Sequence, residues 1–317
     1  MSFEAFEPGY KIAVVGAGAV GCYYGGKLAR NGGNVHFLMR SDLAAVRKQG
    51  LHIRSQDGGF HLERVNAHAS TEEIGPCDLV IVALKTTSNP ALDALIPPLL
   101  KENTAVLTLQ NGLGNEEFLA GRFGTQRIMG GLCFVCLNRT APGVIEHYGY
   151  GTLSIGEFGR ASQERTRRIV EDFAATGITT RLVENLATER WRKLVWNVPF
   201  NGLSIAGGGI TTDLILADEG LHKLTRNLMA EVMAAAGNEG HVIPHEFIEE
   251  QVRRTLKMGA YKPSSLIDYL DGREVEVESI WGEPYRRGLA SGTEMGRMEA
   301  LYYLLKKLTP PGMVRHR

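Results

Sequence analysis

The stretch KIAVVGAGAVGCYYGGKLAR, residues 11–30, decides the fold. Its first part, KIAVVG (11–16), is a short apolar run with the β-branched content of a buried parallel strand. The residues after it predict a helix that ends at Gly32 and Gly33. A strand that passes through a glycine-rich turn into a helix is the opening unit of a Rossmann fold.

Six residues join the strand to the helix and fit the pattern G-x-G-x-x-G: Gly16, Ala17, Gly18, Ala19, Val20 and Gly21. At such a turn, backbone N–H groups and the helix N-terminus can hold a pyrophosphate. Gly16 permits the tight turn, Gly18 lets a phosphate approach, and Gly21 lets helix and strand pack closely. The motif predicts a dinucleotide site, the alternative being a glycine-rich turn without a ligand.

The remaining chain divides into a part where strands and helices alternate and a part that is almost entirely helical. The predicted strands are 34–39, 51–55, 60–65, 78–84, 104–109 and 128–137, with short antiparallel strands at a sheet edge over 143–158. The helical pattern begins near Glu184. The expected class is α/β: an N-terminal Rossmann-like, doubly wound, mostly parallel sheet over 1–184, and a second, all-helical domain over 185–317.

Composition excludes several kinds of partner. Lys plus Arg and Asp plus Glu are equal at 35 each among 317 residues, so no overall positive charge attracts nucleic acid or anionic lipid. No apolar run is long enough to span a membrane, and the N-terminus is acidic where a signal peptide would be basic. We therefore expect a cytoplasmic protein without nucleic-acid or membrane partners, and its C-terminal residues 309–317 to be disordered. The oligomeric state stays open, a homodimer included.

Metal binding is not predicted. Cys133 and Cys136 have zinc or redox spacing, but they lie in an apolar run without a second cysteine pair, which favours structural thiols. His241 and His245 are separated by Pro244, which argues against a shared helical face. Four cysteines in a chain of this length also indicate free thiols and not a disulfide framework.

Polar residues follow three predicted strands at the edge where open α/β sheets bind ligands. Arg40 comes directly off the second strand, where an arginine accommodates the 2′-phosphate of NADP; Asp42 supports the competing interpretation, a ribose hydroxyl of NAD. Lys85 and Asn111 follow two later strands. Taken singly, Arg40 and Lys85 could be solvent-exposed and Asn111 a turn residue. Their shared edge favours a site that binds NADP.

The helical part contains an unusual polar stripe. In ERWRKLVWNVPFNGL (189–203), four-residue spacing places Lys193, Asn197 and Asn201 on one face, while Pro199 predicts a kink. A buried lysine is costly unless partners or solvent reach it, which a ligand-binding cleft provides. Lys193 could then donate a proton to a carbonyl oxygen during reduction, and the asparagines could hold the substrate. The alternative is a lysine that extends from an ordinary helix into solvent.

The chain resembles the ketopantoate reductases, also called 2-dehydropantoate 2-reductases, from residue 11 to about residue 308. The resemblance rests on the glycine motif, on VALKT, LQNGLGN and RWRKLVWNVPFN, and on KPSSLIDYLDGREVEVESIWG (262–282). The most specific part is the Lys-x-x-x-Asn-x-x-x-Asn pattern with a later Pro-Ser and a Glu beyond it. It implies a Rossmann domain, a helical second domain and NADPH-dependent reduction of 2-dehydropantoate to (R)-pantoate, on the route to pantothenate and coenzyme A.

The resemblance also implies roles for individual residues. Lys193 is similar to the proton donor, and Asn197, Asn201 and Ser264 to residues that bind the substrate. Asn111 and Glu276 are similar to residues near both substrate and cofactor. The implied cofactor contacts are, besides the glycine motif, Arg40, Lys85 and the backbone of Val135.

The sequence departs from the family pattern in two segments, and two rival functions stay open. The segment GGGITTDLI (207–215) lacks an Asn that some members carry near Thr211. REVEVESI (273–280) alternates like a strand, although the family pattern predicts a helix. The rivals are a reductase of the same fold for another branched or hydroxylated 2-keto acid, and an NADP-binding redox sensor without turnover. A sensor has no use for the polar stripe, which favours an enzyme.

Overall fold

The structure, a computed structural model, describes residues 6–7, 9–56 and 58–310. The chain separates into two compact units, which are described one at a time. The first comprises residues 1–110 and 115–186, and the second comprises residues 111–114 and 187–317. The first is α/β and the second is helical, so the predicted fold class is confirmed. Part of the tail expected to be disordered, 311–317, lies outside the described residues.

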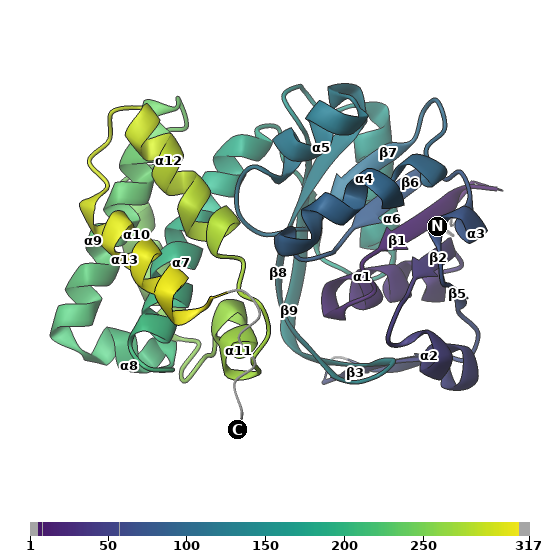
Figure 1. The fold of residues 1–317 in the computed structure, drawn as a ribbon, viewed down its shortest axis with the longest axis horizontal. Coiled ribbons are helices and arrows are strands. Elements are labelled where there is room, and N and C mark those ends of the chain that lie inside the picture. The colour runs from purple at the N-terminus through teal and green to yellow at the C-terminus, as the bar shows by residue number, and fades with distance from the viewer. Residues whose placement is uncertain (1–5, 8, 57, 311–317) are drawn as a thin grey trace. The chain divides into compact units, whose positions relative to one another are not determined.

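A single sheet organises the first unit (Figure 1). Its strands lie in the order β4-β3-β9-β8-β7-β6-β1-β2-β5, and β10 pairs with β9. The pairs of β1 with β2 and β6, and of β7 with β6 and β8, are parallel, as the alternation of strands and helices predicts. The bounds are β1 Lys11–Val15, β2 Asn34–Leu38, β3 Leu51–Ser55, β4 Phe60–Leu62, β5 Asn66–His68, β6 Leu79–Val82, β7 Ala105–Thr108, β8 Ile128–Ala141, β9 Val144–Glu157 and β10 Thr180–Leu182.

Helices cover both faces of this sheet, and β1 shows why its sequence is apolar throughout. Ile12 and Val14 point into a core shared with α1, α2 and α6, whereas Ala13 and Val15 point into a core shared with α3, α4 and α5. Successive side chains of a strand alternate between faces, so a doubly covered strand has no polar side. The helical segments are α1 Ala19–Arg30, α2 Leu43–Gln49, α3 Thr71–Ile74, η1 Thr86–Ala91, α4 Leu92–Leu95, η2 Pro97–Leu99, α5 Asn115–Phe123, η3 Thr125–Arg127 and α6 Glu164–Ala175.

The antiparallel pairing predicted over 143–158 is confirmed, but the prediction that the strands there are short and lie at a sheet edge is wrong. This segment belongs to β9, a strand of 14 residues that forms a long antiparallel hairpin with β8 and lies inside the sheet, between β8 and β3. Gly149 and Gly151 look like strand ends in the sequence, but they coincide with register shifts, which the hairpin absorbs as bulges.

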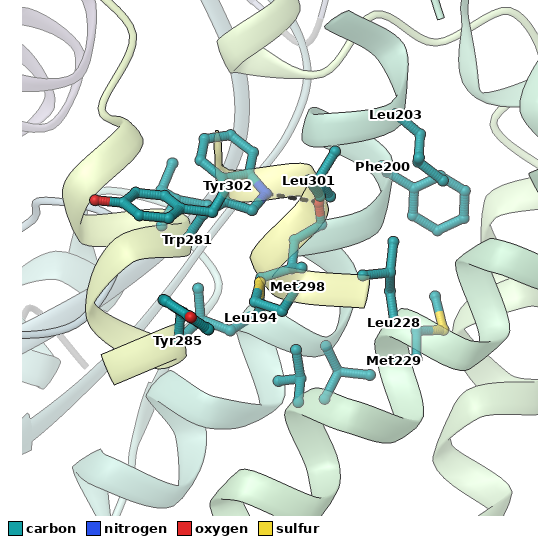
Figure 2. Packing of buried hydrophobic residues seen from close by; sticks show 14 of the residues in the cluster. Leu194, Phe200, Leu203, Leu228, Met229, Trp281, Tyr285, Met298, Leu301 and Tyr302 are labelled. Carbon is teal, nitrogen blue, oxygen red and sulfur yellow. Dashed lines mark hydrogen bonds between the residues drawn. The ribbon is translucent and has the colours of Figure 1, made fainter. Parts of the chain in front are cut away.

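Over its described residues, the regular structure of the second unit is helical: α7 Leu186–Ala206 (whose first residue belongs to the first unit), α8 Thr212–Ala217, α9 Glu219–Asn238, α10 Glu246–Leu256, α11 Ser264–Leu270, the π-helix η4 Glu278–Gly282, α12 Glu283–Ala290 and α13 Gly296–Leu308. Figure 2 shows part of its core, where Leu194 of α7, Leu228 of α9 and Met298 of α13 pack together. Within the described ranges, no helix is long and apolar enough to cross a membrane.

Two local expectations in this unit concern residues 273–280 and Pro199. The 273–280 segment is not a strand: residues 273–276 have no regular structure, and helix begins at Val277 and continues through η4. Its alternating apolar residues Val275 and Val277 are both buried in the helical core, which explains the strand-like pattern. Helix α7 continues through Pro199 without ending, and Trp281 Nε1 donates to the adjacent Val198 carbonyl at 3.0 Å (Figure 2).

Candidate active site

The glycine turn leaves an open space at its middle residue. A Cβ added to Gly16, whose φ is +106°, would lie 2.4 Å from Leu84 N, and one added to Gly21 would lie 2.1 Å from the Gly16 carbonyl oxygen. A Cβ at Gly18 would meet no atom within 4 Å. Gly18 is also the N-cap of α1 and brings no side-chain cap. The turn is therefore tightly packed on two sides and open where a phosphate would reach the helix N-terminus, which fits a dinucleotide.

Arg40 and Lys85, the two basic residues expected to bind the cofactor, follow strands that are neighbours of β1 in the sheet. Arg40 lies just beyond β2, and Lys85 lies beyond β6; both strands pair with β1, which leads into the glycine turn. Arg40 is exposed and Lys85 is partly buried. Gln110, which the sequence did not single out, fixes this edge: its Nε2 donates to the Leu84 carbonyl at 2.9 Å and to Asn89 Oδ1 at 2.7 Å.

Asp42 is turned away from solvent. The residue is 4% exposed, and its carboxylate accepts hydrogen bonds from Ser41 Oγ at 2.8 Å, from Gly143 N at 3.0 Å and from Arg139 Nη1. A carboxylate engaged in this way is poorly placed to accept a ribose hydroxyl, whereas the neighbouring Arg40 is exposed. The geometry thus favours the 2′-phosphate interpretation over its NAD competitor.

Val135 lies on β8 beside a bulge of the hairpin. The register shifts between Phe134 and Val135, and Val135 faces Tyr150, a non-glycine residue with a φ of +63°. Its side chain is partly buried and packs against the core that contains α1. The irregular backbone at this point interrupts the regular ladder, which is where a backbone contact with a ligand can form.

In the helical unit, Lys193 is held by a direct hydrogen bond. Lys193 Nζ donates to Asn111 Oδ1 at 2.6 Å, although the two residues are 82 positions apart. Asn111 opens the short loop 111–114, which is anchored where Leu113 N donates to the Ser279 carbonyl of η4 at 2.9 Å. Gly112 adopts a φ of +87°, and a Cβ there would lie 2.3 Å from the same carbonyl oxygen. Only glycine permits this close approach, so the π-helix positions Asn111 against Lys193.

The two asparagines of the polar stripe differ in their surroundings. Asn201 is 1% exposed, accepts from Ser265 N at 2.9 Å and donates to the Asn197 carbonyl at 3.1 Å. Asn197 is 9% exposed, and within the described part of the chain its side-chain amide makes no recorded hydrogen bond. Asn201 thereby ties α7 to the first turn of α11, where Ser264 is exposed. The Asn197 amide, in contrast, is not used to join these two helices.

Glu276 and Thr211 each lie directly before a helical segment. Glu276 is partly buried, immediately before the helix that continues into η4, and its carbonyl accepts from Ile280 N at 3.2 Å. Thr211 is the N-cap of α8, and its hydroxyl donates to Asp213, so it forms a local turn of its own in place of an asparagine amide.

Metal ligation is not supported by the described residues. Residues 6–7, 9–56 and 58–310 contain no group of three or more His, Cys, Asp or Glu side chains placed to hold an ion. All four cysteines are free thiols, and Cys22 and Cys77 are buried.

The fold and site define a class: two-unit proteins in which a Rossmann-like sheet carries a dinucleotide turn and a helical unit carries a hydrogen-bonded lysine. The ketopantoate reductase PanE/ApbA family model matches residues 12–160, and the model of its C-terminal part matches residues 185–309. The chain belongs to the ketopantoate reductase family.

Individual relatives agree with this assignment over nearly the whole chain. A 2-dehydropantoate 2-reductase of a Nostoc species is 42% identical over 303 residues, covering 94% of this chain and 95% of the relative. One from Mesorhizobium japonicum is 31% identical over 321 residues, covering 94% and 97%. The crystal structure of 2-dehydropantoate 2-reductase from Geobacter metallireducens superposes with a TM-score of 0.92 at 44% identity, covering 94% of this chain and all of that one. Reductases of the family use NADP(H).

Proposed function

We propose that this protein reduces 2-dehydropantoate to (R)-pantoate with NADPH, with Lys193 as the proton donor. The observation that carries the proposal is the 2.6 Å hydrogen bond from Lys193 Nζ to Asn111 Oδ1. It holds a partly buried ammonium group on the same face of α7 as Asn197. An ordinary surface lysine is not held in this way, and the arrangement gives a reductase a fixed acid on the same helix face as the Asn197 amide.

When bound, NADPH supplies a hydride to the carbonyl carbon of the substrate. Lys193 stabilises the negative charge that develops on the carbonyl oxygen and donates a proton to it. Asn111 keeps the ammonium group in position, because its Oδ1 accepts a hydrogen bond from Nζ. Asn197 offers its amide to the polar groups of the substrate, Ser264 hydrogen-bonds the substrate carboxylate, and Asn201 contributes mainly by fixing the turn that carries Ser264.

The cofactor is held by groups from several elements. The backbone of the turn from Gly16 to Gly21 binds the pyrophosphate, and the exposed Arg40 binds the 2′-phosphate. The remaining contacts come from Lys85, Val135, Asn111 and Glu276. The positive charges of Arg40 and Lys85 match the negative charge of NADPH.

The first test measures NADPH oxidation by the purified protein with a panel of 2-keto acids that includes 2-dehydropantoate, repeated with NADH. We expect a kcat/KM for 2-dehydropantoate of roughly 10⁴ M⁻¹s⁻¹ or above, with NADPH preferred. A better result with another branched or hydroxylated 2-keto acid would reassign the substrate. Cofactor binding without turnover of any acid would instead favour the redox sensor.

Lys193→Ala tests the role of the lysine. We expect kcat to fall by about two orders of magnitude or more, while the Kd for NADPH changes little. Lys223→Ala is the matched control, because Lys223 is an exposed lysine of α9 in the same helical unit. Near-normal turnover by the Lys193 variant would remove the lysine as proton donor.

A further inference from the structure

A second arginine stands beside the residues that follow β2. Arg139, on β8, donates from Nη1 to the Asp42 carboxylate and to Ser41 Oγ, the latter at 3.3 Å. Ser41 and Asp42 directly follow Arg40 in the sequence. The Arg139 side chain is 42% exposed. Its hydrogen bonds to other described residues come from Nη1, and Nε and Nη2 make none. The guanidinium therefore has one side bound to the protein and other donors available.

The carboxylate of Asp42 sets the charge of this corner. A buried carboxylate next to a phosphate would repel it, unless a cation compensates the charge. Arg139 supplies this cation, and the backbone N–H of Gly143 and the hydroxyl of Ser41 satisfy the carboxylate further. Asp42 in return fixes one end of a planar guanidinium, a group suited to phosphate oxygens.

The same pair lies close to the helix that follows the glycine turn. Burial raises the pKa of the Cys22 thiol to about 12, with Asp42 raising it further and Arg139 opposing. Cys22 belongs to α1, and its thiol donates to the carbonyl of Ala17 within the glycine motif, at 3.2 Å. Leu43 and Val46 of α2, the helix that Asp42 caps, pack in the same core as Cys22 and Ala17, so the Asp42–Arg139 pair lies on the face of the sheet that carries the glycine turn.

We propose that Arg139 is a second determinant of the preference for NADPH over NADH, and that Asp42 positions its guanidinium toward the 2′-phosphate beside Arg40. The inference rests on the proposed function, because it presumes that NADPH occupies the glycine turn. In the sequence, Asp42 suggests a ribose acceptor for NAD; in the fold, its pairing with Arg139 makes it part of a phosphate site.

The test compares two probes that differ only in the 2′-phosphate, 2′,5′-ADP and 5′-AMP, by isothermal titration calorimetry. For Arg139→Ala we expect binding of 2′,5′-ADP to weaken about tenfold and binding of 5′-AMP to change less than about twofold. Arg139→Lys should recover part of the loss, because it keeps the charge without the planar fork. The salt dependence of 2′,5′-ADP binding should also decrease in Arg139→Ala.

Arg54→Ala is the control, because Arg54 forms an exposed ion pair with Glu146 between β3 and β9 in the same sheet. This variant should bind both probes as the wild type does. Unchanged 2′,5′-ADP binding in Arg139→Ala would overturn the inference, and so would an equal loss for both probes, which indicates a general disturbance. If either result is found while the wild type still reduces the keto acid with NADPH, the proposed function is retained and only the role of Arg139 is rejected. Failure of the wild type to bind NADPH would overturn both.

Discussion

Replacement of Asn201 by alanine tests whether this residue acts by anchoring α11 to α7 or by binding the substrate directly. Asn201 Oδ1 accepts from Ser265 N, and Nδ2 donates to the Asn197 carbonyl, in a position that is 1% exposed. The variant leaves the N–H of Ser265, a buried residue, without its acceptor. An orphaned buried donor costs about 1–3 kcal/mol, and the lost amide volume adds to this, so we expect roughly 2–4 kcal/mol in total.

Tryptophan fluorescence is a selective assay for this effect. The chain has three tryptophans, Trp191, Trp196 and Trp281, and all belong to the helical unit. Urea unfolding followed by their emission therefore reports the stability of that unit, with the free energy obtained by linear extrapolation. We also expect KM for the keto acid to rise, because the first turn of α11 loses its anchor, while the Kd for NADPH stays close to that of the wild type.

Asn197→Ala is the matched comparison on the same helix face. Because its amide makes no recorded hydrogen bond with the described residues, we expect a stability loss below about 1 kcal/mol together with a clear rise in KM. If Asn201→Ala unfolds at the wild-type urea concentration, the anchoring role is wrong and Asn201 acts on the substrate alone.

Three further predictions concern the glycine turn, a buried glutamate that caps α13, and a partly buried aspartate. Gly18→Ala should fold normally, since its Cβ meets no atom within 4 Å, yet weaken NADPH binding at least about tenfold in calorimetry. Glu231→Gln should destabilise the helical unit by about 1–3 kcal/mol in the fluorescence assay, because Glu231 accepts from Arg297 and from the backbone N–H of Met298. Burial raises the pKa of Asp172 to about 6, opposed by the nearby Arg168. The folded state then binds the proton more tightly than the unfolded state, so wild-type stability should fall from about pH 4 to about pH 6. In hydrogen-exchange experiments, the amides of α6 in Asp172→Asn should be protected as well as in the wild type at low pH and better than in the wild type at neutral pH.

Local patterns in the sequence were sufficient to predict those structural features that depend on residues close together in the chain. The glycine motif sits at a strand-to-helix turn and predicts the Rossmann unit, and four-residue spacing aligns Lys193 with the asparagines on α7. Both signals arise from periods fixed by backbone geometry. The resemblance to the ketopantoate reductases was likewise confirmed over both parts of the chain.

Features that depend on long-range pairing were not predictable. Arg139 reaches Asp42 across 97 residues, and no local pattern announces a partner on another strand. The interior position of β9 also depends on β3, which lies much earlier in the chain. The apparent strand over 273–280 came from two valines buried in a helical core, since alternation alone does not distinguish these cases.

The loop 111–114 makes the helical unit discontinuous in the chain. The backbone leaves the first unit after residue 110, returns to it at 115 and leaves again after 186. A fragment cut at the sequence boundary near 185 would therefore lack the acceptor of the Lys193 ammonium and the N–H that binds the Ser279 carbonyl. The helical unit therefore cannot be transferred as one continuous segment. The hydrogen-bond acceptor of Lys193 lies in residues 111–114, which are synthesised before the rest of the unit. An exchange of domains between relatives has to include both segments.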